Sequence, residues 1–349
     1  MTATRTTTAL LKSDAAARLT PTAITRRALR DDDVQVAVSH CGICHTDLHA
    51  LRGGGGPWPL VPGHEFVGEV TAVGPGVTAF AVGDPVAVGN IVDSCGTCDM
   101  CVRSQENCCR EFPLLTYGGT DAEGATTLGG WSTSFVVRES FCYRRPASLD
   151  AAAVAPLMCA GVTVWVPLRT LGVGPGTRVG VAGVGGLGHL AVKLAVALGA
   201  EVTAITGTAA KVVELRSLGA TRVLVTSDAP AMEQARGSLD VVVDCVPVAH
   251  ELAPLLDVLD LDGTLAVVGF LGSFDVDVMD LLMGRKRLLG SGSAGRGSTQ
   301  ELLDFCGEHG ITADVEVVPT ADVEQALERL GRGDVRYRFV LDLADLRPA

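Results

Sequence analysis

The sequence lacks an excess of basic residues, a long apolar run and an export signal. Its 349 residues include 28 Lys and Arg against 40 Asp and Glu, a formal net charge of −12. This charge disfavours nucleic acid or an anionic membrane surface as a partner, because both would repel the chain. No stretch of about 18 uninterrupted apolar residues predicts a transmembrane helix. Residues 1–11 show no basic start followed by an apolar core, so we expect no signal peptide and a cytoplasmic location.

The composition is that of a folded protein with large cores. Hydrophobic residues make up 47% of the chain and charged residues only 19%, which excludes a disordered chain. The length suggests about two domains. In a reducing cytosol the 11 cysteines predict metal binding, catalysis or core packing rather than disulfides.

The pattern of short segments changes near residue 155. Before it, residues 1–150 are rich in Gly, Pro, Thr and short β-branched runs, which predicts a β-rich domain. From Arg178 onward, apolar strands alternate with helical segments, which predicts a doubly wound parallel sheet of the α/β class. Expected strands in the first part are Val34–Val38, Glu65–Val73, Pro85–Val88 and Ser134–Val137; those in the second are Arg178–Val184, Glu201–Thr206, Arg222–Val225, Leu239–Asp244, Thr264–Gly269 and Leu288–Gly290. Helices are expected at Gly186–Leu198 and Ala209–Leu218.

The C-terminal tail is too small for a sheet of its own. We expect a helix at Thr299–His309, a strand at Ile311–Val318, a helix at Asp322–Leu330 and a final strand at Val335–Leu343. This tail is therefore expected to pack back on the first domain.

Four cysteines within fifteen residues predict a structural zinc site. Cys95, Cys98 and Cys101 form two C-x-x-C steps, and Cys109 follows. Four thiolates can surround one Zn²⁺ tetrahedrally and leave no open position. Cys108 is a rival for the fourth ligand, although the spacing favours Cys109. The alternative of buried free cysteines in a loop does not account for the repeated step.

Cys44, His64 and Cys159 form a second candidate set. A single His or Cys is more often a core residue, but together these three supply two thiolates and an imidazole. That composition leaves a fourth position free, as in a catalytic zinc site. Zinc there would act as a Lewis acid on a carbonyl or an alcohol.

A glycine-rich fingerprint predicts a dinucleotide site. The motif comprises Gly183, Gly185, Gly186, Leu187 and Gly188, follows a predicted strand and opens a predicted helix. A simple tight turn is the alternative, but the βαβ context favours binding of a pyrophosphate at the helix N-terminus.

The end of the next strand favours NADP(H) over NAD(H). NAD sites usually place an acid there, whereas this chain carries Thr206, Thr208 and Lys211 and no acid. Hydroxyls and a lysine suit a ribose 2′-phosphate. The alternative is an ordinary helix start, with Thr208 as N-cap and Lys211 in solvent.

At these residues the sequence resembles the zinc-containing medium-chain dehydrogenases. Within that family it is most similar to the cinnamyl alcohol dehydrogenase branch and bacterial NADPH-dependent aldehyde reductases. The matching segments extend over about residues 30–343: Cys-Gly-Ile-Cys-His-Thr-Asp-Leu-His at 41–49, Val-Pro-Gly-His-Glu at 61–65, the cysteine run, Leu-Gly-Gly-Trp at 128–131, Cys-Ala-Gly-Val-Thr-Val at 159–164 and Val-Arg-Tyr-Arg-Phe-Val at 335–340.

The resemblance implies a GroES-like catalytic domain, residues 1–156 and 296–349, and a Rossmann domain, residues 157–295. It implies hydride transfer between NADP(H) and an aldehyde or primary alcohol, aromatic or allylic, in a homodimer. Asp47 would orient His64 or the metal shell. Glu65 would bind zinc transiently during ligand exchange.

The resemblance also assigns a proton relay and further cofactor contacts. Thr46 would hydrogen-bond the substrate oxygen, and a proton would pass through the nicotinamide ribose to His49. The alternative for His49 is a surface imidazole. Further residues implied along the cofactor are His45, Thr163, Gly269, Ser291 and Arg338.

Three departures from the family bear on these expectations. Between His49 and Pro59, where relatives carry an aromatic residue and a longer loop against the substrate, this chain has Arg52, Gly53–Gly56 and Pro57-Trp58. Gly207 stands where NADP-binding relatives carry Ser or Thr, and Cys245 replaces a common Thr. The altered loop leaves open a reductase of an activated C=C or C=N bond. A third, weaker alternative is a non-catalytic NADPH-binding redox sensor that uses Cys44 and Cys159.

Overall fold

The computed structural model describes residues 4–54, 57–269 and 272–347. The chain forms two compact units, one of residues 1–159 with 294–349 and the other of residues 160–293. Sequence analysis expected the boundaries after residues 156 and 295. Gly55 and Gly56 of the glycine run lie outside the described residues.

The first unit is built on a seven-stranded sheet with the order β16-β17-β3-β4-β5-β9, in which β8 also pairs with β3. Fully buried apolar side chains, among them Phe66, Trp131 and Phe339, form its core. The strands of this unit are β1 (Arg5–Leu11), β2 (Thr20–Arg26), β3 (Asp33–Ile43), β4 (Phe66–Val73), β5 (Pro85–Val88), β6 (Ile91–Asp93), β7 (Leu114–Leu115), β8 (Ser134–Arg138), β9 (Tyr143–Arg144), β16 (Val315–Pro319) and β17 (Arg338–Asp342).

The helices of this unit are short apart from two in the C-terminal tail. They are α1 (His45–His49), η1 (Ala50–Gly54), α2 (Asp99–Val102), η2 (Glu106–Cys108), η3 (Glu139–Phe141), α3 (Ala151–Val154), η4 (Ala155–Met158), α10 (Arg296–His309), η6 (Thr320–Asp322) and α11 (Val323–Gly331).

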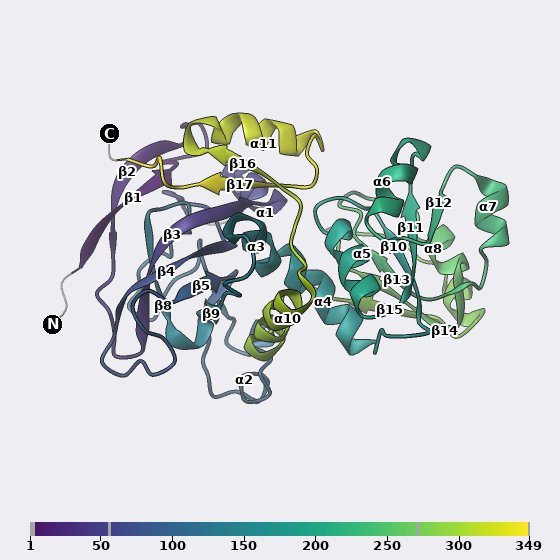
Figure 1. Cartoon of the computed structure of the whole chain (residues 1–349), viewed down its shortest axis with the longest axis horizontal. Helices are drawn as coiled ribbons and strands as arrows, with labels where there is room; N and C mark the ends of the chain where they lie inside the picture. The colour runs from purple at the N-terminus through teal and green to yellow at the C-terminus, as the bar shows by residue number, and fades with distance from the viewer. Residues whose placement is uncertain (1–3, 55–56, 270–271, 348–349) are drawn as a thin grey trace. The chain divides into compact units, whose positions relative to one another are not determined.

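The C-terminal tail returns to the first unit as expected. Strand β17 pairs antiparallel with β3 and parallel with β16, so the last strand of the chain lies beside the strand that leads to Cys44. Helix α11 lies along β16 and β17 (Figure 1). It buries Val323, Ala326, Leu327 and Leu330, the spacing of an amphipathic helix. The strand predicted at 311–318 is shorter in the structure. It begins at Val315, and residues 311–314 are not part of a strand.

The second unit is the predicted doubly wound sheet. Six parallel strands have the order β12-β11-β10-β13-β14-β15, and their central members are almost fully buried, as parallel strands covered on both faces must be. The elements are α4 (Ala160–Thr170), β10 (Arg178–Ala182), α5 (Gly188–Ala197), β11 (Glu201–Thr206), η5 (Ala209–Lys211), α6 (Val212–Ser217), β12 (Arg222–Val225), α7 (Ala229–Gln234), β13 (Leu239–Asp244), α8 (Ala253–Asp257), β14 (Leu259–Val267), α9 (Val278–Leu282) and β15 (Arg287–Gly290).

Two predicted elements of this unit need correction. The strand expected at 264–269 begins earlier and ends earlier, as β14 (Leu259–Val267). The helix expected at 209–218 starts as a 3₁₀ turn, η5, before α6 begins at Val212. Thr208 caps that turn by accepting a hydrogen bond from the Ala210 amide, which favours the tighter start.

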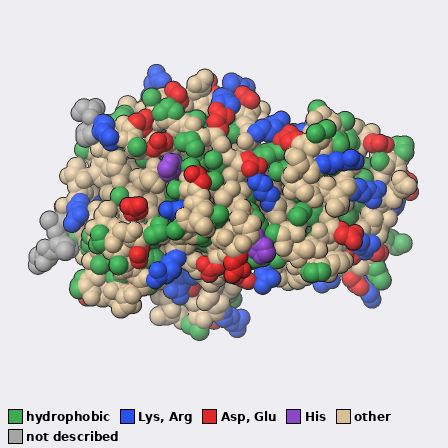
Figure 2. All heavy atoms as spheres, in the orientation of Figure 1, with side chains coloured by type: hydrophobic (Ala, Val, Ile, Leu, Met, Phe, Trp, Pro, Cys, Tyr) green, Lys and Arg blue, Asp and Glu red, His purple; other side chains and the backbone are tan. Residues whose placement is uncertain are grey.

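The described surface carries both signs of charge. Figure 2 shows acidic and basic side chains mixed over the face drawn. Among the described residues no single helix is long and apolar enough to span a bilayer. Only the consecutive helical segments Ala151–Met158 and Ala160–Thr170, taken together, reach the length and composition of such a span.

Candidate functional site

The first unit brings Cys44, His64 and Cys159 together. Cys44 lies between β3 and α1. His64 lies just before β4, and Cys159 directly follows η4. The Cys44 Sγ lies 3.9 Å from the Cys159 Sγ, and the His64 Nε2 lies 3.3 Å from the Cys159 Sγ. Three donors from distant parts of the chain therefore converge on one point.

Asp47 fixes two of these donors from behind. Its side chain is fully buried, and its Oδ2 accepts a hydrogen bond from the Cys44 amide at 2.9 Å. Its Oδ1 lies 3.1 Å from the His64 Nδ1 and accepts a hydrogen bond from the Gly63 amide at 3.0 Å. A proton on Nδ1 leaves Nε2 free to act as a ligand, and this is how a metal-binding histidine is usually held.

The electrostatics of the cluster favour a thiolate at Cys44. Its hydrogen bond with Cys159 lowers the pKa of Cys44 well below the usual value, against the effect of burial, and His64 and Arg338 lower it further. Burial opposes a charge on His64, yet Asp47 and Cys44 outweigh it and raise the pKa of that ring. A thiol and an imidazolium must lose their protons before they can bind a metal ion. A cation that binds this cluster would therefore displace protons from it.

Glu65 supplies a buried carboxylate beside the cluster. Its Oε1 pairs with the Arg338 guanidinium, which β17 carries. Burial raises the pKa of Glu65 to about 8, and Arg338 lowers it in opposition. The Glu65 Oε2 is buried without a hydrogen-bond partner among the described residues. An unpartnered buried oxygen at this place fits a nearby cation.

These distances fit a tetrahedral zinc ion. With Zn–S bonds of about 2.3 Å, two ligating sulfurs of a tetrahedron lie about 3.8 Å apart. The Cys44–Cys159 separation of 3.9 Å matches that value. Because only three donors are present, the fourth position is open to a substrate or water, as in catalytic zinc sites.

Thr46 and His49 lie on α1 directly beyond Cys44. They are three residues apart and both exposed, which places them on one face of the helix. The Thr46 Oγ1 accepts a hydrogen bond from the Cys44 Sγ at 3.6 Å. The predicted proton-relay residues thus lie on the helix that begins at the metal cluster.

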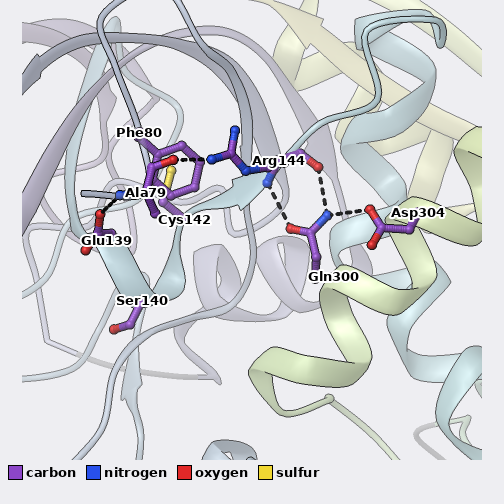
Figure 3. Close-up of a pocket in the computed structure, with 8 residues that line it drawn as sticks. All are labelled: Ala79, Phe80, Glu139, Ser140, Cys142, Arg144, Gln300 and Asp304. Carbon is purple, nitrogen blue, oxygen red and sulfur yellow. Dashed lines mark hydrogen bonds between the residues drawn. The ribbon is translucent and has the colours of Figure 1, made fainter. Parts of the chain in front are cut away.

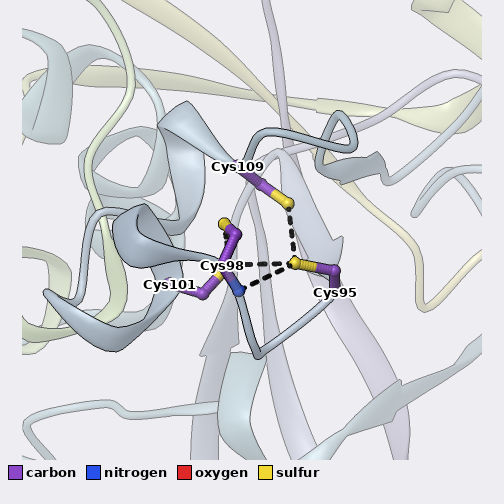
Figure 4. Close-up of side chains that lie close together, drawn as sticks. All are labelled: Cys95, Cys98, Cys101 and Cys109. Atoms are coloured by element: carbon purple, nitrogen blue, oxygen red, sulfur yellow. Dashed lines mark hydrogen bonds between the residues drawn. The ribbon is translucent and has the colours of Figure 1, made fainter.

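A second cluster consists of Cys95, Cys98, Cys101 and Cys109 (Figure 4). Its sulfur atoms are separated by 3.8 Å for Cys95–Cys101, 3.6 Å for Cys98–Cys101 and 3.4 Å for Cys109–Cys95. These values fit four ligands around one zinc ion. Cys109 belongs to this cluster, whereas Cys108 is exposed.

Backbone amides support thiolates in the second cluster. Amides of Arg110 and Cys101 lower the pKa of Cys98 to about 6. Amides of Thr97 and Cys98 lower the pKa of Cys95, while burial raises that of Cys101 to about 11. All four positions are filled by sulfur, so an ion here has a structural role.

The glycine fingerprint lies between β10 and α5 in the second unit. Gly183 has a φ of +76°, and a Cβ on Gly188 would lie 2.5 Å from the Gly183 carbonyl oxygen. A Cβ on Gly185 would meet nothing within 4 Å, which leaves its backbone open to a close ligand. Gly186 and Leu187 complete the turn before the helix.

The three residues predicted for a 2′-phosphate lie at the end of β11. Thr206 is buried, and its Oγ1 accepts a hydrogen bond from the Thr208 amide at 3.4 Å. Thr208 is exposed, and the Lys211 Nζ reaches the Val184 carbonyl of the fingerprint at 3.5 Å. The ammonium group therefore lies beside the glycine turn, where a phosphate can replace a weak carbonyl contact.

The remaining predicted cofactor residues are divided between the units. Gly269 follows β14, where a Cβ would lie 2.1 Å from the Val246 carbonyl oxygen. Ser291 follows β15, and its buried hydroxyl has no partner among the described residues. Thr163 lies on α4 of the same unit. His45 on α1 and Arg338 on β17 belong to the first unit.

Sequence reasoning missed several residues that support the site. The Tyr117 ring lies against His64 with a centroid separation of 5.9 Å. Trp131 donates a hydrogen bond to the Gly42 carbonyl at 3.3 Å and packs where Gly63 has no Cβ. The Leu-Gly-Gly-Trp segment was the only available signal for Trp131, and a lone tyrosine gave none.

A separate pocket lies elsewhere on the first unit. It has a volume of about 410 Å³, and none of its lining residues is a predicted site residue (Figure 3). Gln300 exchanges hydrogen bonds with the Arg144 backbone and donates one to Asp304. These polar groups are already paired with one another.

Comparisons with known proteins agree with this geometry. Residues 30–147 match the alcohol dehydrogenase GroES-like domain, and residues 186–308 match the zinc-binding dehydrogenase family. The chain is 48% identical to a protein named "Probable cinnamyl alcohol dehydrogenase 8A" of Oryza sativa subsp. japonica, over 95% of this chain and 93% of that protein. It is 47% identical to a mannitol dehydrogenase of Petroselinum crispum, over 94% and 98% of the two chains.

A solved structure of a relative extends the match to the whole fold. The cinnamyl alcohol dehydrogenase of Helicobacter pylori complexed with NADP(H) superimposes with a TM-score of 0.91 at 32% identity, covering 98% of this chain and 99% of that one. The chain belongs to the zinc-binding medium-chain dehydrogenases, as an oxidoreductase of the alcohol dehydrogenase type.

Proposed function

We propose that the protein is an NADPH-dependent zinc alcohol dehydrogenase that reduces aromatic or allylic aldehydes to primary alcohols. The observation that carries this proposal is the cluster of Cys44, His64 and Cys159, whose three donors leave a fourth metal position open. Asp47 holds Cys44 and His64 in place through hydrogen bonds. The reaction combines an aldehyde, NADPH and a proton into an alcohol and NADP⁺. A non-catalytic redox sensor would require neither an open metal position nor a relay.

Cys44, His64 and Cys159 would hold the catalytic zinc, and Glu65 would contact it during ligand exchange. Cys95, Cys98, Cys101 and Cys109 would hold the structural zinc. When bound, the catalytic ion supplies a Lewis acid that polarises a carbonyl. Asp47 keeps the His64 Nε2 directed at the ion.

Thr46 and His49 would handle the proton. The Thr46 hydroxyl would donate a hydrogen bond to the substrate oxygen as that oxygen gains charge. His49, exposed on the same face of α1, would give up a proton towards this path and recover one from solvent. The exchange between His49 and solvent transfers protons alone, because the cofactor supplies the hydride.

The Rossmann unit would bind the cofactor through the five-residue fingerprint. Thr206, Thr208 and Lys211 would bind the 2′-phosphate, and β11 ends without the acid that a 2′-hydroxyl prefers. Thr163, Gly269, Ser291, His45 and Arg338 would complete the contacts along the dinucleotide. The NADP(H) complex of the Helicobacter pylori relative supports this preference.

Metal content and product analysis test the proposal together. The wild-type protein should contain about two zinc ions per chain, and Cys44→Ser about one with loss of turnover. Cys108→Ser, a matched cysteine outside both clusters, should keep both ions and full activity. One ion per chain and no turnover in the wild type would leave only a structural site.

Cinnamaldehyde separates the competing reactions in one assay. Cinnamyl alcohol as the product of NADPH oxidation would support reduction of the carbonyl, whereas a saturated aldehyde would favour the C=C reductase. Mannitol with NADP⁺ belongs in the same panel, because a mannitol dehydrogenase is among the relatives. Faster turnover of mannitol than of cinnamyl alcohol would contradict the proposed substrate class.

We also propose a cytoplasmic homodimer that pairs two Rossmann sheets edge to edge. Strand β15 is an edge of the six-stranded sheet. Val278, Met279, Leu282 and Met283, which precede it, are each more than half exposed. An unpaired edge strand that follows exposed apolar side chains in the chain favours antiparallel pairing with an identical copy across a two-fold axis. Light scattering should give twice the chain mass, and Met283→Glu should give the monomer.

A further inference from the structure

The turn after α1 places a backbone where a side chain would collide with His49. Helix α1 ends at His49 and continues into a π-helical turn, η1 (Ala50–Gly54). A Cβ built on Gly54 would lie 2.1 Å from the Nε2, 2.3 Å from the Cε1 and 2.4 Å from the Cδ2 of His49. Real Cβ atoms do not approach other heavy atoms within about 3 Å, because repulsion rises steeply below contact distance. The imidazole therefore occupies the volume that any other residue at position 54 would fill.

The two described glycines of this turn have different roles. Gly53 has a φ of +89°, and a Cβ there would meet nothing within 4 Å. Glycine is favoured at position 53 by backbone conformation alone. Gly54 does not have a left-handed φ, so an alanine there avoids the strain of that conformation, and the three atoms nearest to its Cβ would all belong to the His49 ring. This difference makes Gly54→Ala a selective perturbation of His49.

The His49 ring lies directly beside the Gly54 backbone. The side chain is exposed and makes no hydrogen bond to the described residues. A surface imidazole without such a wall would exchange among rotamers. Because Gly54 has no Cβ, the ring occupies the volume that a Cβ would otherwise fill.

We infer that Gly54 is a positioning residue for the proton relay, because its missing side chain leaves room for the His49 imidazole. This inference rests on the proposed function, in which His49 exchanges a proton between solvent and the path to the substrate oxygen. A methyl group at position 54 would displace the ring into another rotamer. Because His49 is exposed, the displacement would cost little stability while moving the imidazole away from the path.

Four variants of the zinc-loaded enzyme test the inference: Gly54→Ala, His49→Ala, the double variant and Gly297→Ala. Gly297 is a matched control, since a Cβ there would meet only the Ser104 Cβ at 3.8 Å. We expect His49→Ala to lower kcat about tenfold, which is less than the roughly 100-fold or more that general acid–base catalysis typically contributes, because water partly replaces an exposed relay. Gly54→Ala should lower kcat by a similar factor with little change in the KM for aldehyde. Gly297→Ala should resemble the wild type.

Non-additivity is the decisive readout. If Gly54 acts through His49, the double variant should be no slower than His49→Ala alone. Thermal midpoint, zinc content and NADPH affinity should be unchanged in Gly54→Ala. A normal kcat for Gly54→Ala beside a slow His49→Ala would overturn the inference and leave the relay intact, as would multiplicative losses in the double variant. A normal kcat for His49→Ala would overturn the relay and this inference with it, while leaving the zinc assignment untouched.

Discussion

Replacement of Asp47 by asparagine would remove a carboxylate that accepts from three donors at once. The Cys44 amide, the Gly63 amide and the His64 ring all lie within 3.1 Å of its two oxygens, and the side chain has no exposed surface. Asparagine has the same shape but only one oxygen. Its amino group would face a second N–H donor whichever way the amide is turned.

The cost of Asp47→Asn follows from these contacts. One buried donor is left without an acceptor, which costs about 1–3 kcal/mol, and the surviving bonds lose their ionic character. We expect the free energy of unfolding to fall by about 3 kcal/mol in total. Because His64 is no longer held by a carboxylate, zinc affinity at the catalytic site should fall about 10–100-fold.

Chelator competition and urea unfolding measure the two effects separately. Zinc affinity is obtained by titrating the loaded protein with a chromogenic chelator, and stability from the urea midpoint of the same preparation. Asp14→Asn is the matched control, because the Asp14 Oδ1 also accepts two backbone N–H bonds, from Ala16 and Ala17, but in full solvent. It should change neither quantity measurably, since water replaces the lost acceptor.

One result would refute the reasoning about Asp47. If Asp47→Asn kept zinc affinity within about twofold of the wild type, the His64 orientation would not depend on the carboxylate. Loss of stability without loss of zinc would assign Asp47 to the fold alone.

Three further predictions concern other parts of the molecule. Arg26→Met should lower the free energy of unfolding by about 2–4 kcal/mol in urea titrations, because its guanidinium donates to several acceptors in residues 128–134 that would each lose a hydrogen bond; an unchanged midpoint would contradict this. Cys108, which is exposed, should react with iodoacetamide before Cys306 in the native zinc-loaded protein, because Cys306 is buried and burial raises its pKa to about 12; mass spectrometry that finds the reverse order would disprove it. Lys211→Ala should raise the KM for NADPH about tenfold and leave that for NADH unchanged, and an equal change for both would remove the phosphate role.

The parts of the molecule that sequence predicted are those with local signals. Buried parallel strands such as β10 and β13 appear as short valine-rich segments, and the glycine fingerprint marks the turn between β10 and α5. The four structural cysteines lie within fifteen residues, so their spacing alone indicates a metal site.

The remaining features depend on contacts between distant segments. Helix α4 was not expected, because Gly161 and Pro167 interrupt its pattern, although its buried face stabilises it. The ring of Tyr117 meets His64 only after the chain has folded, and nothing at 117 marks that contact. The space at Gly54 likewise depends on the rotamer of a residue five positions earlier, which composition does not encode.

The discontinuity of the first unit also determines the order in which the protein can be completed on the ribosome. Residues 160–293 form a compact unit before the tail is made, whereas β3 lacks its neighbour β17 until residues 338–342 emerge. At about 5–20 residues per second, His64 precedes Arg338 by roughly tens of seconds. During that interval Glu65 has no guanidinium partner, and Cys44 lacks the charge of Arg338 that lowers its pKa. The electrostatic environment that lowers the pKa of Cys44 is therefore complete only after the last strand of the chain has been made.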